Sequence, residues 1–243
     1  MGGPDAPWHP VAWDEEIFGV RTARIRSTRP ARDELRAALA DVRAAGIGVV
    51  HLLVDSDADA SKRAAEECGF SLVDLRVTLQ WDVKPVSPAG RPGVVLRPAR
   101  AEDRVRLETI ARSSYGMSRY YRDGRYAPER CGELYARWVR QCADAPSGAV
   151  LVADAGGAVA GFVACSVASG GDSGSIALFG VDEPQRGKGL ASLLLAGAQD
   201  WFARAPVPRV TVVTQGRNLD ALRAYERQGF LTRSVQLWYH LWI

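Results

Sequence analysis

The chain has 243 residues, of which 47% are hydrophobic and 24% charged, so it is long enough to bury a core of its own. Its net charge is only +3, and the absence of any run of Lys or Arg argues against nucleic acid as a partner. No apolar run is long enough to cross a bilayer, and residues 1–5 lack the basic start of a signal peptide, so we expect a cytoplasmic protein that does not contact a membrane.

Residues 1–86 alternate predicted strands and helices, and we expect them to form a small α/β domain. The run GIGVVHLLV is continuously apolar, as in a buried strand. Asp55, Asp57 and Asp59 alternate there, but the Gly and the distant Glu of a calcium loop are missing, so no metal site is expected. The predicted elements are strand 20–25, helix 31–45, strand 46–54, helix 58–68 and strand 71–83.

The stretch KPVSPAGRPG at residues 84–93 is rich in Pro and Gly, which suppress regular structure. We therefore place a domain boundary here, with a larger α/β domain over residues 92–243. Its predicted elements are strand 94–97, a helical region 101–143 interrupted by the aromatic segment 118–126, hairpin 148–153 with 159–167, strand 175–181, helix 190–203, strand 207–214, helix 219–227 and strand 234–242.

A loop between a predicted strand and a predicted helix has the composition of an anion site. The first N–H groups of a helix have no partner within it and lie at the positive end of its dipole. Glycines let the backbone approach a phosphate, and basic side chains add charge. Taken alone, the segment reads equally well as a basic surface turn. Its residues are Gln185, Arg186, Gly187, Lys188, Gly189, Leu190 and Ala191.

A second motif downstream makes the pattern specific. The order of elements, with Arg186, Gly189 and Ala191 in the loop, is followed by the sequence NLDALRAYERQGF. Over residues 94–243 the chain thereby resembles the GNAT N-acyltransferase superfamily. The resemblance implies a mixed-sheet α/β fold, acetyl-CoA as cosubstrate, and a loop that binds its pyrophosphate. It also implies that Phe179 and Val181 contact the pantetheine arm, in an opening where strands 175–181 and 207–214 splay apart. Asn218 is expected to bond the same arm or to cap the helix that follows it, and it can do both.

The resemblance also implies the chemistry, which is direct attack of an amine on the thioester within a ternary complex. Tyr225 is then the expected general acid, because a phenol within hydrogen-bond reach can protonate the leaving thiolate; the alternative is that it packs on Phe230. His240 is one candidate for the general base, since its ordinary pKa suits that task. A structural strand histidine is an equally good interpretation of His240.

The acceptor is expected to be a small-molecule primary amine that meets the helical region 111–138. The chain resembles the branch of the family that acetylates nucleotide-linked amino sugars through short, scattered matches at residues 13–14, 18–19, 118–120, 135, 138, 214–215 and 238–240. Stacking and charged hydrogen bonds suit such a substrate, although core packing explains the same residues. Other open alternatives are a different amine, an antibiotic or a protein N-terminus, a non-catalytic acyl-CoA-binding module, and a monomer or a homodimer. The expected acceptor residues are Arg119, Tyr120, Tyr121 and Tyr126.

Overall fold

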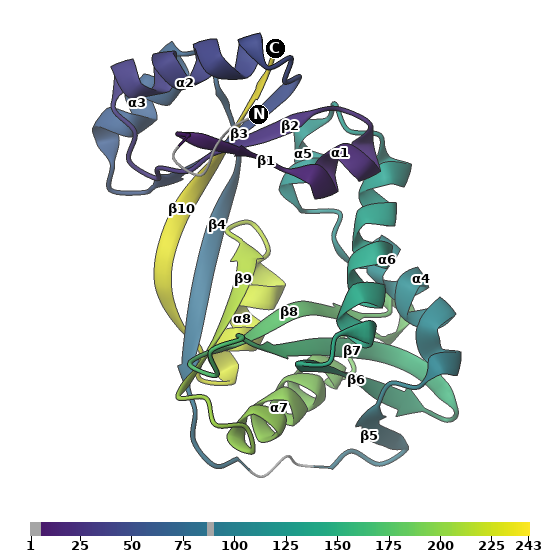
Figure 1. Ribbon diagram of the computed structural model, residues 1–243. Helices are drawn as coiled ribbons and strands as arrows, with labels where there is room; N and C mark the ends of the chain where they lie inside the picture. Colours follow the sequence, from purple (N-terminus) through teal and green to yellow (C-terminus); the bar gives the residue numbers. More distant parts are fainter. Residues whose placement is uncertain (1–5, 87–89) are drawn as a thin grey trace.

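One mixed sheet of ten strands runs through the part of the chain that the structure, a computed structural model, describes: residues 6–86 and 90–243 (Figure 1). The order across the sheet is β1-β2-β3-β10-β4-β9-β8-β7-β6-β5. The predicted absence of a signal peptide at residues 1–5, and the part of the predicted boundary at residues 87–89, lie outside the described residues.

The strands have these bounds: β1 Trp8–Pro10, β2 Thr22–Ile25, β3 Val49–Asp55, β4 Ser71–Asp82, β5 Val94–Pro98, β6 Gly148–Ala155, β7 Ala158–Val167, β8 Gly174–Val181, β9 Arg209–Gln215 and β10 Leu231–Trp242. The α-helices are α1 Ala12–Phe18, α2 Arg32–Ala44, α3 Asp59–Glu67, α4 Arg104–Ser114, α5 Arg119–Asp123, α6 Pro128–Asp144, α7 Leu190–Ala203 and α8 Leu219–Arg227. Two short 3₁₀ helices, Ala101–Asp103 and Glu183–Gln185, complete the set.

The mixed α/β fold and the order of its elements are confirmed. The helices expected over 190–203 and 219–227 have those bounds. The start of α8 is fixed by Asn218, whose side chain accepts a hydrogen bond from the Ala221 N–H at 3.3 Å, as a helix cap does. Its end is fixed by Gly229, which turns the chain with a φ of 81°. Elements β1 and α1 were not predicted, and the aromatic interruption at 118–126 contains the short helix α5.

The chain contains an internal repeat. Each bound of β3, α3 and β4 lies 160 residues before the matching bound of β9, α8 and β10. For example, β3 begins at residue 49 and β9 at residue 209, and β4 ends at residue 82 and β10 at residue 242. Each helix is followed by Gly-Phe, with the glycine at a φ of 88° in the first copy and 81° in the second. The first copy has Ala58 and Ala65 where the second has Asn218 and Tyr225, so it lacks the side chains that carry the predicted chemistry.

The two copies of the repeat exchange their last strands. Strand β10 lies between β3 and β4, and β4 lies between β10 and β9, with antiparallel pairing throughout. Figure 1 shows β4 and β10 as two long strands side by side, joining the upper and lower parts of the molecule. The predicted boundary at 84–93 therefore falls between strands of one continuous sheet, and the division into domains 1–86 and 92–243 stays a prediction.

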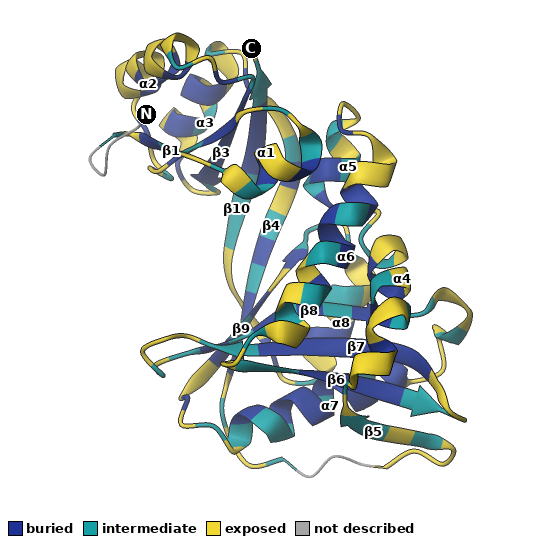
Figure 2. Cartoon of the chain, turned by 45° about the vertical axis from the view of Figure 1, so that its right-hand side comes forward, coloured by how far each residue is buried: buried dark blue, intermediate teal, exposed yellow. Residues whose placement is uncertain are grey.

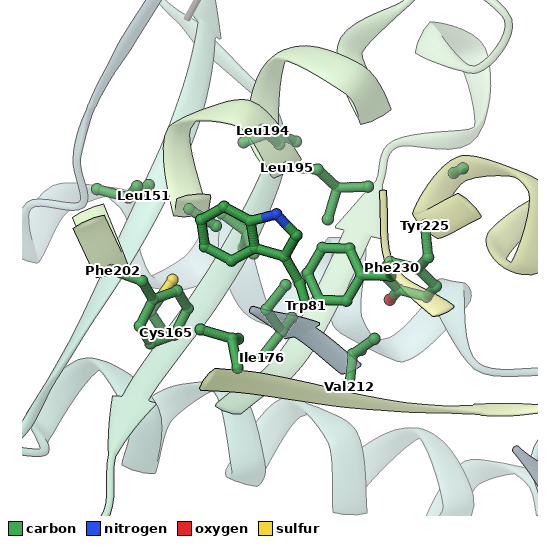
Figure 3. Packing of buried hydrophobic residues seen from close by; sticks show 14 of the residues in the cluster. Trp81, Leu151, Cys165, Ile176, Leu194, Leu195, Phe202, Val212, Tyr225 and Phe230 are labelled. Atoms are coloured by element: carbon green, nitrogen blue, oxygen red, sulfur yellow. The ribbon is translucent and has the colours of Figure 1, made fainter. Parts of the chain in front are cut away.

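The main hydrophobic core contains residues from both sides of the predicted boundary. Trp81, on β4, is 2% exposed and packs among residues of α7, α8, β8 and β9, where Figure 3 shows its ring facing Phe230. The inner strands and the inward faces of the helices are buried (Figure 2). Burying an indole of this size stabilises the fold by several kcal/mol, about 3–5 when measured as truncation to Ala.

A gap in the sheet positions the site. Strands β8 and β9 are parallel neighbours that pair only from Gly174 to Ile176, against Val210 to Val212. Beyond these residues the two strands separate, which confirms the expected splay. The backbone groups of β8 that face β9 after Ile176 are left without a strand partner there.

Candidate active site

The loop before α7 has the backbone of an anion site. Gly187 and Gly189 both adopt a φ of 75°, in the left-handed region that suits glycine. No side chain caps α7, so its first N–H groups stay available to an anion. The side chain of Lys188 donates to Gln185 Oε1 at 3.0 Å, and Arg186 Nε donates to the Val181 carbonyl at 3.2 Å.

A tyrosine that the sequence did not single out occupies the gap between β8 and β9. The Tyr115 hydroxyl accepts a hydrogen bond from the Phe179 N–H at 2.8 Å and donates to the Phe179 carbonyl at 3.0 Å. Its ring stacks on Tyr135 with centroids 4.1 Å apart. The backbone groups of Phe179 that we expected to meet the pantetheine arm are therefore paired with a side chain in this structure.

Tyr225 also lies next to β8. Its ring centroid is 6.0 Å from that of Phe179 and 5.7 Å from that of Phe230. Burial raises the pKa of its hydroxyl above the ordinary value, so the group keeps its proton and remains a donor. Both interpretations of Tyr225, packing on Phe230 and facing the thioester site, agree with this position.

A cleft of about 470 Å³ opens beside the end of β9. Arg119 and Tyr120 of α5, two of the expected acceptor residues, line it. The two halves of the chain both contribute to its walls, which suits an acceptor site placed at their junction. The other lining residues are Trp13, Asp74, Arg76, Ser118, Leu134, Tyr135, Trp138, Gln141, Val213, Thr214, Gln215 and Trp238.

Arg119 is a fixed cation in the wall of this cleft. Its guanidinium lies over the ring of Trp238 at 4.3 Å and over that of Tyr120 at 4.0 Å. Tyr120 in turn donates to the carboxylate of Asp14 at 2.9 Å. Burial, followed by the nearby charge of Arg119, lowers the pKa of His51 well below its ordinary value, so that ring stays neutral and accepts from Arg119 at 3.1 Å.

His240 is held on both ring nitrogens. Nδ1 is bonded to the carboxylate of Asp123, and Nε2 accepts from Arg119 at 3.0 Å. Burial, helped by Arg119, lowers its pKa to about 4 although Asp123 opposes the shift. A ring with both nitrogens engaged has no free lone pair for a substrate proton. The geometry favours the structural interpretation, and the role of His240 as a base stays a prediction.

Asp74 is a carboxylate in the cleft that sequence reasoning passed over. It lies on β4 opposite Trp238 of β10 and is 3% exposed. Burial raises its pKa to about 6, against the opposing effects of its bond from the Leu75 N–H and of Arg217 and Arg119. In the sequence it is one polar residue of an alternating strand, and only the pairing of β4 with β10 places it beside Arg119.

Two expected acceptor residues lie outside the cleft. The Tyr121 hydroxyl donates to the Arg112 carbonyl at 3.3 Å. The Tyr126 hydroxyl is buried and lies 2.9 Å from His51 Nε2, with its ring 4.3 Å from that of Phe18. The structure thus places Arg119 and Tyr120 in the wall of the cleft and the other two outside it. The part of all four in acceptor binding stays a prediction.

This arrangement of phosphate-type loop, splayed strands and tyrosine agrees with the comparison to known proteins. The family model described as the acetyltransferase (GNAT) family matches residues 108–230. The chain belongs to this family. Among solved structures, the GCN5-related N-acetyltransferase from Kribbella flavida matches with a TM-score of 0.69 and 17% identity, covering 99% of this chain and 88% of its own. The chain is therefore a GNAT N-acetyltransferase.

Two curated proteins are similar to this GNAT acetyltransferase. The dTDP-fucosamine acetyltransferase of Escherichia coli O6:H1 (strain CFT073) is 27% identical over 94% of this chain and 95% of its own length. The spore coat polysaccharide biosynthesis protein SpsD of Bacillus subtilis (strain 168) is 29% identical over 62% of this chain, and the match spans about half (52%) of SpsD.

Within residues 6–86 and 90–243, none of the helices combines the length and the apolar character that a membrane crossing requires. Within the same residues, no group of three or more His, Cys, Asp or Glu side chains is arranged to hold a metal ion.

Proposed function

We propose that this acetyltransferase moves the acetyl group of acetyl-CoA onto the amine of a nucleotide-linked amino sugar, by direct attack in a ternary complex. The observation that carries the proposal is the position of the gap between β8 and β9. The gap has Tyr225 beside it, and the acceptor cleft reaches the end of β9 at Val213, Thr214 and Gln215.

The chain's groups fit a coenzyme A donor. Gly187 and Gly189 give the loop the left-handed turns that bring backbone N–H groups toward a pyrophosphate, and Arg186 and Lys188 supply charge. Beyond Ile176, β8 offers backbone groups to which an extended pantetheine amide can pair. For the arm to reach Phe179, the Tyr115 hydroxyl has to give up its two bonds there.

Tyr225 beside the gap and Asp74 in the cleft have distinct tasks in the transfer. The amine nitrogen attacks the thioester carbon, the carbon–sulfur bond breaks, and Tyr225 gives its proton to the departing sulfur. The proton lost by the amine goes to Asp74, directly or through water. A carboxylate with a pKa of about 6 is ionised at neutral pH, so it can accept the one proton that the neutral amine loses, and solvent returns that proton to the Tyr225 phenolate once the products leave.

The acceptor class is inferred from the cleft and from the relatives. A cavity of about 470 Å³ is of the size that holds a sugar with part of a nucleotide. Arg119, whose guanidinium is held over the Trp238 ring, offers it a positioned cation. The name of the Escherichia coli relative states a nucleotide-linked sugar, and that of the Bacillus subtilis relative states polysaccharide biosynthesis.

A panel of acceptors tests the proposal. The purified protein is incubated with acetyl-CoA and, separately, with a nucleotide-linked 4-amino-4,6-dideoxy sugar, the same sugar without its nucleotide, an aminoglycoside antibiotic and a peptide with a free N-terminus. Thiol release and product mass are measured together. We expect the nucleotide-linked sugar to gain one acetyl group with the highest kcat/KM. Preferential acetylation of the aminoglycoside or the peptide would overturn the proposal, as would a failure to acetylate any member of the panel.

A further inference from the structure

A second cavity, of about 350 Å³, lies next to the acceptor cleft. We name it the arginine pocket, after three of its lining residues. It is formed where α5 and the loop before α8 meet the first residues of β4 and the last residues of β10. Its lining consists of Ser71, Leu72, Val73, Arg122, Asp123, Arg125, Arg217, His240 and Trp242. The function proposed above assigns nothing to Arg122, Arg125 or Arg217.

The arginine pocket has more positive than negative side chains, which favours the binding of an anion. Its own carboxylate, Asp123, is already bonded to His240 Nδ1 and accepts from Trp242 Nε1 at 3.1 Å. The guanidiniums of Arg122 and Arg125 have no carboxylate within ion-pair distance among the residues that the structure describes. Arg217 is 3.5 Å from Asp74 and donates to the Val73 carbonyl at 3.3 Å. Guanidinium groups left in this way bind phosphate oxygens through paired N–H donors.

The pocket also offers an aromatic surface. Trp242 lies at the end of β10 with the guanidinium of Arg125 5.7 Å from its ring centre. A tryptophan beside arginines suits a ligand that joins a flat ring to phosphates, since stacking and charge then act on neighbouring parts of one molecule. Inorganic phosphate would use the guanidinium groups alone.

The arginine pocket and the acceptor cleft are neighbours along β4 and β10. On β4, Val73 lines the pocket and Asp74, the next residue, lines the cleft. Across the pairing with β10, Ser71 is opposite His240 and Asp74 is opposite Trp238. Arg217 lines the pocket while its Nε lies 3.5 Å from Asp74. The two cavities are thus close enough for one extended ligand to have a part in each.

We propose that the arginine pocket binds the nucleoside diphosphate portion of the acceptor, while the amino sugar lies in the cleft beside Asp74. Arg122, Arg125 and Arg217 hold the diphosphate, and Trp242 stacks on the base. This inference rests on the proposed function, because it assigns the acceptor of that reaction to a second subsite. It makes the arginines binding residues and leaves the transfer chemistry with Tyr225.

Direct binding tests the inference without turnover. Isothermal titration calorimetry measures the affinity of dTDP, UDP, GDP and inorganic pyrophosphate for the wild type, for the double variant Arg122→Gln/Arg125→Gln, and for Arg36→Gln. Arg36 is an exposed arginine of α2, away from both cavities, so its variant is the matched control. We expect at least one nucleoside diphosphate to bind the wild type and the control equally, and the double variant roughly 10- to 100-fold more weakly. Equal affinity in the double variant, or no binding to the wild type, would overturn the inference.

Two further experiments show whether the nucleotide binds in the arginine pocket or in the coenzyme A site, and whether it belongs to the acceptor. The titrations are repeated with saturating coenzyme A, whose own phosphates compete if the nucleotide enters the donor site; displacement by coenzyme A would count against the arginine pocket. In steady-state assays, the double variant should raise KM for the nucleotide-linked amino sugar at least tenfold, with kcat and the KM for the nucleotide-free sugar unchanged. If the wild type acetylates the nucleotide-linked sugar and the double variant has the same KM, the inference fails while the proposed function stands. If the wild type acetylates no nucleotide-linked sugar, the proposed function fails and the calorimetry still decides the inference.

Discussion

Replacing Tyr225 with Phe removes one hydroxyl group from a ring that lies beside Phe179 of β8. The ring remains, with its contacts to Phe179 at 6.0 Å and to Phe230 at 5.7 Å between centroids. The packing of this part of the core is therefore conserved. We expect the free energy of unfolding to change by about 1 kcal/mol or less, as for a substitution that keeps shape and volume.

The effect on the transfer should be much larger. A positioned general acid contributes about 10²- to 10⁴-fold to a rate, so kcat should fall by that factor. Because burial raises the pKa of the Tyr225 hydroxyl, the wild-type group stays protonated at neutral and mildly alkaline pH, and the loss should be the same throughout that range. KM for acetyl-CoA should change by no more than roughly threefold, since the loop before α7 is untouched.

The assay follows thiol release and acetylated product with the best acceptor of the panel, from mildly acidic to mildly alkaline pH. Tyr239→Phe is the matched control, because that tyrosine is also buried but its hydroxyl donates to Glu66 at 3.1 Å, on the α3 side of the sheet. The control should retain wild-type kcat. An unchanged kcat in Tyr225→Phe across the pH range would refute the assignment of Tyr225 as the acid.

Three further predictions concern Asp74, Tyr115 and the place of β4 in the sheet. Asp74→Asn should lower kcat/KM. The wild type should lose activity as the pH falls below about 6, where the carboxylate takes up a proton, and the variant should not show this loss. The same loss of activity at low pH in the variant would contradict the assignment. Tyr115→Phe leaves the N–H and carbonyl of Phe179 without their partner and should lower the free energy of unfolding by about 1–3 kcal/mol. Because acetyl-CoA can pair with the same groups, it should raise the melting temperature of this variant more than that of the wild type, and an equal or smaller rise would argue against the competition. The fragment 92–243 lacks β4, which separates β9 from β10, so it should not fold alone by circular dichroism but should fold when mixed with fragment 1–86; a cooperative unfolding transition in the isolated larger fragment would show that the predicted domain is independent.

Local patterns in the sequence were sufficient for most elements. Helices α7 and α8 were predicted at their observed bounds because a glycine loop and a capping Asn mark their starts, and apolar residues recur at helical spacing. The segment 8–18 was missed, since a three-residue strand has no period to detect and the seven residues of α1 have no side-chain cap. Short elements of this kind form through contacts with the rest of the fold, as Ile17 does in the core beneath α4 and α6.

Some residues of the candidate site could likewise be predicted from local patterns, and others could not. The loop before α7 and Tyr225 could be predicted because each belongs to a contiguous motif. Asp74 could not, because its place beside Arg119 depends on β4 entering the sheet between β9 and β10. Tyr115 could not either, because nothing in the helical region shows that its hydroxyl reaches β8. Long-range strand order creates both neighbourhoods, and no local period in a sequence records it.

The exchange of strands between the two copies of the repeat also sets an order of events during synthesis on the ribosome. Strand β3 pairs with β2 on one edge and with β10 on the other, where His51 is opposite His240, and β4 pairs with β9 and β10. Strands β9 and β10 are made more than a hundred residues later. Until then β3 and β4 present unpaired edges, which are prone to join other chains. We expect the nascent N-terminal part to depend on chaperones, and the protein to fold slowly for its size because its central pairs close such long loops.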